Sequence, residues 1–235
     1  MSKASLWQRV RSSLQASAGE VVFGMEDSTV SIFGLVFGVA ATTTDQKAVL
    51  IAGASGAVAA AVSMMAGSYL DAETGQDQVR VMARRIDAEM QKDKAEVLDG
   101  VTQRLQAAGL PPDQAATVGG FLCAQPSVLR SVAMALADPQ DADSRQGPLV
   151  RSLWMLIADF LAAAIPILPF GFLAVPQGRV VSATVTTLLL VALGVGRAKI
   201  GGRPMVRTVI ETVSIGVAAA AAGVGIGVWI SQIFT

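Results

Sequence analysis

Two adjacent carboxylates inside an apolar stretch are the first residues that could do chemistry. Glu26 and Asp27 lie in a run from Val21 to Gly38, and no other charged residue follows until Asp45. A carboxylate in a lipid-spanning segment is costly and usually faces water, a partner charge or a bound cation. Alternatively, the pair marks a helix start at the membrane surface, where acids favour the N-terminal dipole. These residues alone leave both interpretations open.

The chain restricts which metal sites are possible. It has no histidine, and Cys123 is its only cysteine. Any metal site must therefore use carboxylate, carbonyl, hydroxyl or thioether ligands. Such ligands suit hard or borderline divalent ions better than a tetrahedral zinc site.

The elements that must position these residues are long apolar runs. Of 235 residues, 52% are hydrophobic and 15% charged. Four charge-free runs approach or exceed the length needed to cross a bilayer: 28–44, 48–70, 180–196 and 212–235. A fifth span, roughly 152–177, is apolar except for Asp159. We therefore predict an all-α, polytopic membrane protein with five transmembrane helices and its termini on opposite sides.

A charged segment interrupts the apolar runs between the second and third spans. Its apolar residues recur with helical spacing and predict short helices, one of them ending near Gly109 and another covering 127–136. Long helices continuing the second and third spans should complete this insert. The predicted domains are an N-terminal amphipathic segment at 1–20, transmembrane helices one and two at 21–70, a cytoplasmic helical domain at 71–150, and transmembrane helices three to five at 151–235.

The last three spans hold further unusual residues. Pro166 and Pro169 remove backbone donors and should kink or end the third helix inside the membrane. Asp159 in the same span should be paired, protonated or pathway-lining. Glu211 follows Arg207 by four residues and should pair with it along one helix.

The distribution of Lys and Arg predicts the orientation. Basic residues gather before the first span and between the fourth and fifth, whereas the opposite side has only Lys47 and Arg179. The N-terminus and the insert should be cytoplasmic and the C-terminus outside. The apolar run that follows the N-terminal basic residues carries Glu26 and Asp27 and lacks a small-residue cleavage site, so we expect no removable signal peptide. The short loops favour a bacterial inner membrane.

Three motifs in order resemble those of the vacuolar iron transporters. Gly24-Met25-Glu26-Asp27-Ser28 resembles the family pattern G-x-x-D-G, and Ser63-Met64 resembles the Ser-Met pair of the second span. Ile165-Pro166-Ile167-Leu168-Pro169 resembles the Ile-Pro-x-x-Pro motif of the third span. The resemblance implies a homodimer that exports ferrous iron or manganese in exchange for protons, along a path between the subunits and with no tightly bound cofactor.

The resemblance also implies the ligands. Asp27 and Met64 would bind the ion inside the membrane, and Glu20 would be an acid at the entrance. A carboxylate and a thioether offer one hard and one softer ligand to a borderline ion, and the carboxylate can also take a proton. Met65 lies about 100° further round the helix, so Met64 is preferred.

The insert matches the family's metal-binding domain only in part. The candidate ligands are Glu89, Glu96, Asp99, Met134 and Asp138. Arg84 and Arg85 stand where the family has acids, so we expect fewer or weaker sites. The alternative interpretation of these residues is a solvated helix face.

Two other classes of function compete with transport. An enzyme is not expected, because the chain has no nucleotide-binding loop and no nucleophile–base constellation, and no nucleic-acid partner is indicated. The second hypothesis is a membrane-anchored metal sensor or regulatory scaffold that binds ions without moving them. Asp27 and Met64 discriminate between the hypotheses, because only a transporter needs ligands inside the bilayer.

Overall fold

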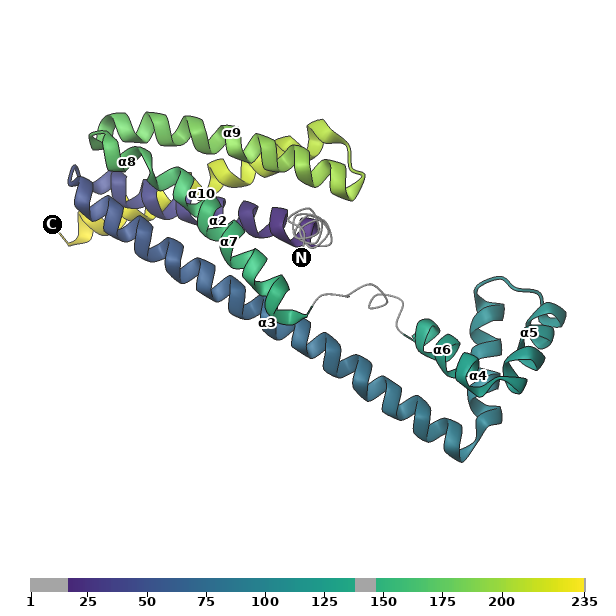
Figure 1. Cartoon of the computed structure of the whole chain (residues 1–235). Helices are drawn as coiled ribbons and strands as arrows, with labels where there is room; N and C mark the ends of the chain where they lie inside the picture. Colours follow the sequence, from purple (N-terminus) through teal and green to yellow (C-terminus); the bar gives the residue numbers. More distant parts are fainter. Residues whose placement is uncertain (1–16, 138–146, 235) are drawn as a thin grey trace, which may run out of the picture. The chain divides into compact units, whose positions relative to one another are not determined.

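The fold is a set of helices joined by short connections (Figure 1). The computed structural model describes residues 17–137 and 147–234, and no strand occurs among them. The predicted amphipathic segment, up to residue 16, lies outside the described residues. The helices are α2 Ala18–Thr42, α3 Gln46–Lys92, α4 Lys94–Ala107, α5 Pro112–Ala124, α6 Pro126–Ala137, α7 Pro148–Ile167, α8 Pro169–Phe172, α9 Val175–Gly201 and α10 Met205–Ile233.

Five helices in the described part of the chain are long and apolar enough to cross a membrane: α2, α3, α7, α9 and α10. The predicted all-α fold with five such helices is confirmed. The chain divides into two compact units, which we call the membrane unit (Met1–Tyr69 with Pro148–Thr235) and the insert unit (Leu70–Gly147).

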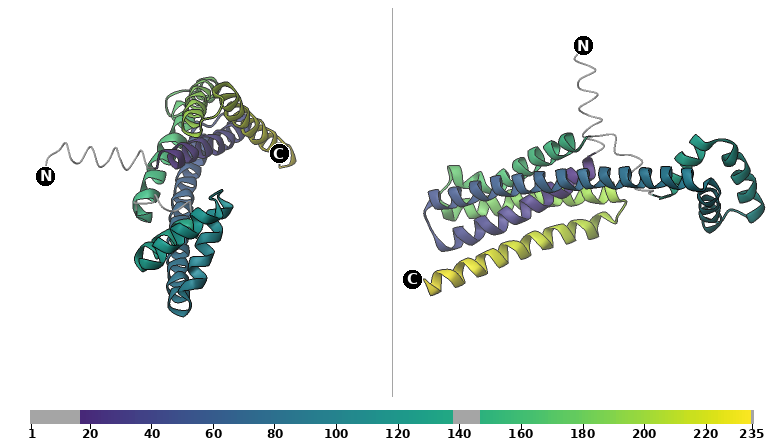
Figure 2. Two further views of the ribbon diagram at one scale, coloured as in Figure 1. Left: turned by 90° about the vertical axis from the view of Figure 1, so that its right-hand side faces the viewer. Right: turned by 90° about the horizontal axis from the view of Figure 1, so that it is seen from below.

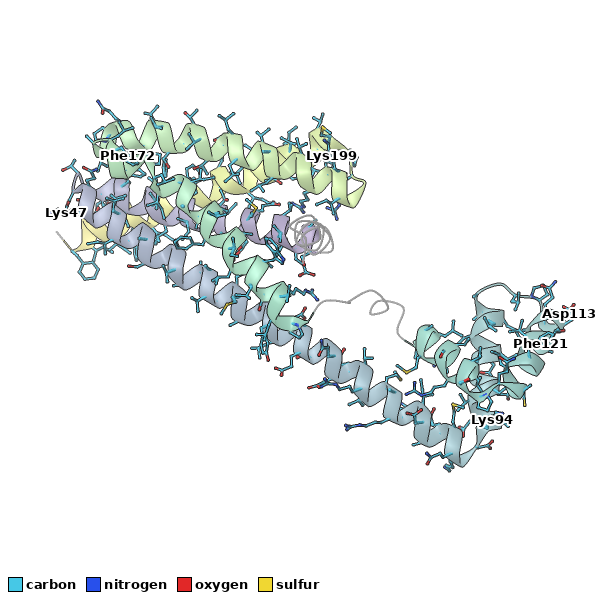
Figure 3. The ribbon with its side chains drawn as sticks, viewed as in Figure 1. Lys47, Lys94, Asp113, Phe121, Phe172 and Lys199 are labelled. Atoms are coloured by element: carbon cyan, nitrogen blue, oxygen red, sulfur yellow. The ribbon has the colours of Figure 1, made fainter. Side chains whose placement is uncertain are left out.

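Loops meet at one end of the membrane unit. Asp45 begins α3 by accepting a 2.9 Å hydrogen bond from the Lys47 backbone N–H. The Gln46 side-chain amide donates to the Phe170 carbonyl of α8 at 2.6 Å, which ties the α2–α3 loop to the α7–α9 connection. Figure 3 shows Lys47 and Phe172 at this end and Lys199 at the opposite end. At that opposite end, Gly19 and Val22 of α2 line one pocket with Arg197 and Ile200 of α9.

The closest helix pair in the membrane unit is α2 with α10 (Figure 2). A Cβ added to Gly38 would lie 2.7 Å from the Gly223 carbonyl oxygen, and one added to Gly34 would lie 2.9 Å from the Ala219 carbonyl oxygen. These glycines allow backbone to approach backbone, as helix packing in membranes favours. Larger residues here would push α10 away from α2.

The third span begins and ends earlier than the sequence suggested. It runs from Pro148 to Ile167, and α8 follows from Pro169. Pro166 lies inside the last turn of α7, and the helix ends at Ile167, two residues before Pro169 begins α8. The expectation of a long helix continuing this span into the insert is wrong, because α7 starts at Pro148, where proline at a first helical position begins rather than extends a helix.

The insert unit has a small apolar core between α3, α4, α5 and α6. Its buried members are Ile86, Val97, Val101, Leu122, Leu129 and Ala133. Asp93 begins α4 by accepting from the Ala95 backbone N–H at 2.9 Å. Gly109 follows α4 with a φ of +101°, a conformation that favours glycine. The predicted helices ending near Gly109 and covering 127–136 are present.

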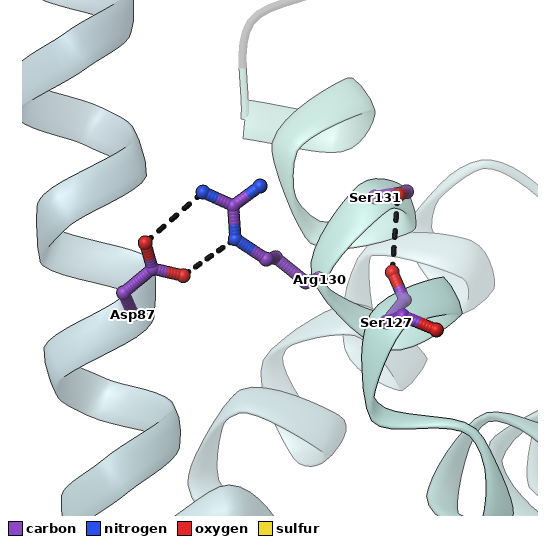
Figure 4. A network of polar contacts seen from close by, with 4 residues as sticks. All are labelled: Asp87, Ser127, Arg130 and Ser131. Atoms are coloured by element: carbon purple, nitrogen blue, oxygen red, sulfur yellow. Dashed lines mark hydrogen bonds and ion pairs between the residues drawn. The ribbon is translucent and has the colours of Figure 1, made fainter.

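A bidentate ion pair joins α3 to α6 inside the insert unit (Figure 4). Arg130 Nε donates to Asp87 Oδ1 at 2.5 Å, and Nη2 donates to Oδ2 at 3.0 Å. The hydrogen bond from Arg130 lowers the pKa of Asp87 below its ordinary value. Asp87 is therefore ionised and holds α6 on the helix that carries Glu89.

Candidate functional site

The polar end of α2 is built around Glu26. This side chain is only 8% exposed. Its Oε1 accepts 3.0 Å hydrogen bonds from Arg197 Nη1 of α9 and from the Thr212 hydroxyl of α10. Its buried Oε2 has no hydrogen-bond partner among the described residues. Glu26 therefore joins three helices and is committed to structure.

Asp27 points away from this network. It is exposed, and it lies in a row of exposed α2 residues spaced four apart with Phe23, Ser31 and Leu35. Residues at this spacing share one helix face. No hydrogen bond or ion pair to Asp27 occurs within the described part of the chain. We call this row the α2 stripe; it is a face that residues 17–137 and 147–234 leave exposed.

The other residues predicted for the ion path lie on separate helices. Glu20 forms an ion pair with Arg151 in the first turn of α7. Met64 is half-buried on α3. The predicted entrance acid therefore already has a basic partner, while the proposed ligand pair Asp27 and Met64 is divided between α2 and α3.

The two acids that no motif explained have different surroundings. Glu211 Oε1 accepts a 3.0 Å hydrogen bond from Arg207 Nε, which confirms the predicted pairing along α10. Asp159 is 0% exposed. Neither of its carboxylate oxygens accepts a hydrogen bond of normal geometry from the described residues, and no basic side chain there forms an ion pair with it. We predicted that Asp159 would be paired, protonated or pathway-lining. The described residues do not pair it, so protonation and a place in the pathway remain.

In the insert unit, three of the predicted ligands share one groove. Glu89, Glu96 and Asp99 line a groove of about 490 Å³ together with Arg85 and Arg104. Glu89 Oε1 accepts a 2.8 Å hydrogen bond from Arg85 Nε, which raises the pKa of Arg85. The groove therefore contains arginine side chains as well as acids, and the arginines compete with a metal ion for the carboxylates.

The remaining insert ligands are not brought into one arrangement. Met134 packs beside the apolar core, and Asp138 lies outside the described residues. Across residues 17–137 and 147–234, no group of three or more His, Cys, Asp or Glu residues is placed to hold a metal ion. A metal site built from the described residues would therefore add thioether or hydroxyl ligands, or ligands from a second chain.

Comparison with known proteins decides the family. A family model described as "VIT family" matches residues 18–228. The chain belongs to the VIT family. It is 26% identical over 198 residues to "Vacuolar iron transporter" of Centaurea cyanus, an alignment that covers 84% of this chain and 81% of the relative.

Two further relatives of this VIT-family protein show the same extent of similarity. "Vacuolar iron transporter 1" of Arabidopsis thaliana is 27% identical over 206 residues, which cover 85% of this chain and 82% of the relative. "Vacuolar iron transporter 2" of Oryza sativa subsp. japonica is 26% identical over 210 residues, covering 85% and 83%. The resemblance inferred from the three motifs is confirmed. Family and apolar helices together make the chain a multi-pass membrane protein.

Sequence reasoning missed two arrangements in this VIT-family protein. One is the link from Glu26 to Arg197 and Thr212, which joins residues distant in the sequence. The other is Met155, which lies one helical turn before Asp159 and is buried with it. The spacing of Met155 and Asp159 in an apolar run was a usable signal, because residues four apart share a helix face.

Proposed function

We propose that this VIT-family protein moves divalent transition-metal ions, ferrous iron or manganese, out of the cytoplasm in exchange for protons. The observation that carries the proposal is the exposed Asp27 on the α2 stripe. A charged residue facing lipid is costly, so an exposed carboxylate on a membrane-spanning helix needs a partner, water or an ion. Relatives named as vacuolar iron transporters favour an ion.

A homodimer would cover the α2 stripe. Two copies meeting along Phe23, Asp27, Ser31 and Leu35 would bring two carboxylates to one path between the subunits. Met64 would then add a thioether from α3. This pairing of ligands suits a borderline divalent ion.

Proton exchange follows from the same carboxylate. Binding a metal ion requires the carboxylate to be deprotonated, and protonation from the far side of the membrane favours release. The protonated site can then return to the cytoplasmic face. We therefore expect faster metal uptake into vesicles whose lumen is acidic, and metal entry should make the lumen more alkaline.

The insert unit would take up ions on the cytoplasmic side. Its groove acids Glu89, Glu96 and Asp99, with Met134 and Asp138, are the proposed ligands, and Arg85 should weaken them by repelling cations. The basic loop at α9–α10 supports a cytoplasmic N-terminus and insert. A bacterial inner membrane is the location we propose.

The test is transport by the purified protein in sealed vesicles. Uptake of ferrous, manganese and cobalt ions is followed with and without a proton gradient, together with lumenal pH. Asp27→Asn should abolish uptake, whereas Glu211→Gln, in an acid already paired with Arg207, should keep it. Metal binding without any uptake by the unaltered protein would favour the sensor or scaffold instead. Equal uptake at every gradient would favour a channel or uniporter.

A further inference from the structure

Asp159 is a buried acid that forms no ion pair with the described residues. Its side chain is 0% exposed between the helices of the membrane unit. Both carboxylate oxygens are buried, and neither accepts a hydrogen bond of normal geometry from the described residues; the nearby donor is the neutral hydroxyl of Ser28. Burying a carboxylate without compensation is strongly unfavourable. A bound cation or a proton would supply the compensation that one neutral hydroxyl does not.

A second donor atom lies beside this carboxylate. Met155 is one turn earlier on α7 and is also buried. A Cβ added to Gly24 of α2 would collide with Met155 Sδ and would lie 2.5 Å from Asp159 Oδ1. The thioether and the carboxylate thus converge on the same point of the α2 backbone. Glycine at position 24 leaves them that space.

Two more oxygen-bearing side chains of α2 lie on the next turn. Ser28 is buried close to the Asp159 carboxylate, and Asp27 is near enough to interact with it electrostatically. Two carboxylates near each other in a medium of low dielectric repel strongly. A cation between α2 and α7 would offset that repulsion, and the Ser28 hydroxyl offers a neutral oxygen ligand.

We propose that Asp159 and Met155 of α7, with the hydroxyl of Ser28 of α2, form a second binding site for a divalent transition-metal ion. This site lies inside one protomer, behind the α2 stripe that carries Asp27. It deepens the proposed function and rests on it for the kind of ion carried. Its ligands are distinct from Asp27 and Met64.

The donor set selects the class of cation. A carboxylate and a hydroxyl are hard oxygen ligands, whereas a thioether is soft, so the combination suits a borderline ion such as ferrous iron or cobalt. Magnesium and calcium prefer oxygen ligands alone. Removing the sulfur should therefore weaken cobalt binding more than manganese binding.

The experiment counts ions bound to the purified full-length protein. Equilibrium dialysis with Co²⁺ or Mn²⁺ alone is compared for the unaltered protein and its variants. Asp159→Asn should lower the number of tightly bound Co²⁺ ions by one per chain. Met155→Leu conserves volume and should keep the fold. It should weaken one Co²⁺ site at least about tenfold, with a smaller effect on Mn²⁺.

Matched controls separate this site from general effects of mutation. Glu211→Gln removes a paired acid of α10, and Met205→Leu removes an exposed methionine; neither should change the count. An unchanged count in both Asp159→Asn and Met155→Leu would overturn the proposal and assign a proton to Asp159. If Asp27→Asn and Asp159→Asn each removed the same bound Co²⁺ ion, the two residues would belong to one site, and the proposal of a separate second site would be overturned.

Vesicle uptake measured on the same preparations keeps the two proposals apart. If Asp159→Asn loses an ion while the unaltered protein moves no metal, the second site stands and the transport function fails. If the unaltered protein transports metal and Asp159→Asn binds as many ions as before, transport stands and the second site fails.

Discussion

The acids of the membrane unit and those of the insert unit differ in burial. Glu26 and Asp159 are buried between helices, the first with Arg197 and Thr212 and the second without an ion pair. In the insert unit, the groove acids are exposed or half-exposed beside arginines. Charges interact far more strongly in a medium of low dielectric than in water. The same residue types should therefore have large effects in the first unit and small ones in the second.

This difference affects what counts as evidence for a site. An exposed acidic groove has a ready alternative interpretation as a solvated helix face. A buried carboxylate without an ion pair cannot be interpreted as part of a solvated face, because water does not reach it. The membrane unit is thus where a substitution is most informative.

The largest effect should come from Asp27. Asp27→Asn keeps the shape of the side chain but removes its charge and its exchangeable proton, so metal uptake into vesicles should fall at least about tenfold, toward background. The protein should remain folded, because the described residues give Asp27 no hydrogen bond or ion pair to lose. Glu211→Gln is the control. Near-normal uptake by Asp27→Asn would contradict the expectation that acids of the membrane unit affect transport more than acids of the insert unit.

The next effect compares two arginine–glutamate pairs within the membrane unit. Arg197→Ala leaves Glu26 buried without its charge partner and should lower the free energy of unfolding by about 2 kcal/mol, a value reduced because Arg197 is partly exposed. Arg207→Ala breaks an exposed pair with Glu211 and should cost about 0.5 kcal/mol or less. Thermal unfolding in detergent measures both. Equal effects of the two substitutions would show that burial does not set the strength of these pairs.

The sequence predicted the helices better than the contacts between them. Apolar runs predict membrane-spanning helices because length and composition are local properties, and Gly109 marks a helix end through its own backbone chemistry. The pairing of α2 with α10 depends on Gly34, Gly38 and Gly223 meeting across the fold. Nothing local in the chain determines which glycines meet.

The candidate site divides in the same way. Asp27 was found from its apolar context, and its place on an uncovered face required the structure. The roles of Glu26 and Asp159 could not be separated by sequence, since both are acids in apolar runs. Arg197, which distinguishes them, lies far from Glu26 in the chain and reaches it only through the packing of α9 on α2.

A smaller effect is expected in the groove of the insert unit. Arg85 pairs with Glu89 and lines the groove, and Arg84 is a second exposed positive charge on α3. Exposed charges act over distances comparable with the Debye length. Replacing both arginines by Glu should tighten divalent-ion binding to the insert, most clearly at low salt. Calorimetric titration with Mn²⁺ compares the variant with Arg80→Ala, which removes a basic residue paired with Asp77 elsewhere on the same helix. Several tight sites already present in the unaltered insert would contradict the predicted weakening.

The smallest effect should be the pH dependence of the ion pair between Asp87 and Arg130. The hydrogen bond from Arg130 lowers the pKa of Asp87, so the pair stabilises the insert unit fully above the ordinary pKa of an aspartate, near 3.9. This stabilisation is lost as pH falls through the lowered pKa of Asp87 in the folded state. Because both side chains are nearly half exposed, solvent weakens the pair.

Asp87→Asn should therefore be slightly less stable than the unaltered protein at neutral pH, and the two should converge as the pH is lowered below 4 or so. A fluorophore on Cys123, which is exposed in the insert unit, reports thermal unfolding of that unit. Arg80→Ala, which breaks a more exposed pair, should follow the unaltered protein at every pH. If the difference between Asp87→Asn and the unaltered protein persisted unchanged in acid, the side chain would act through its shape, and the contrast between the charges of the two units would lose its support.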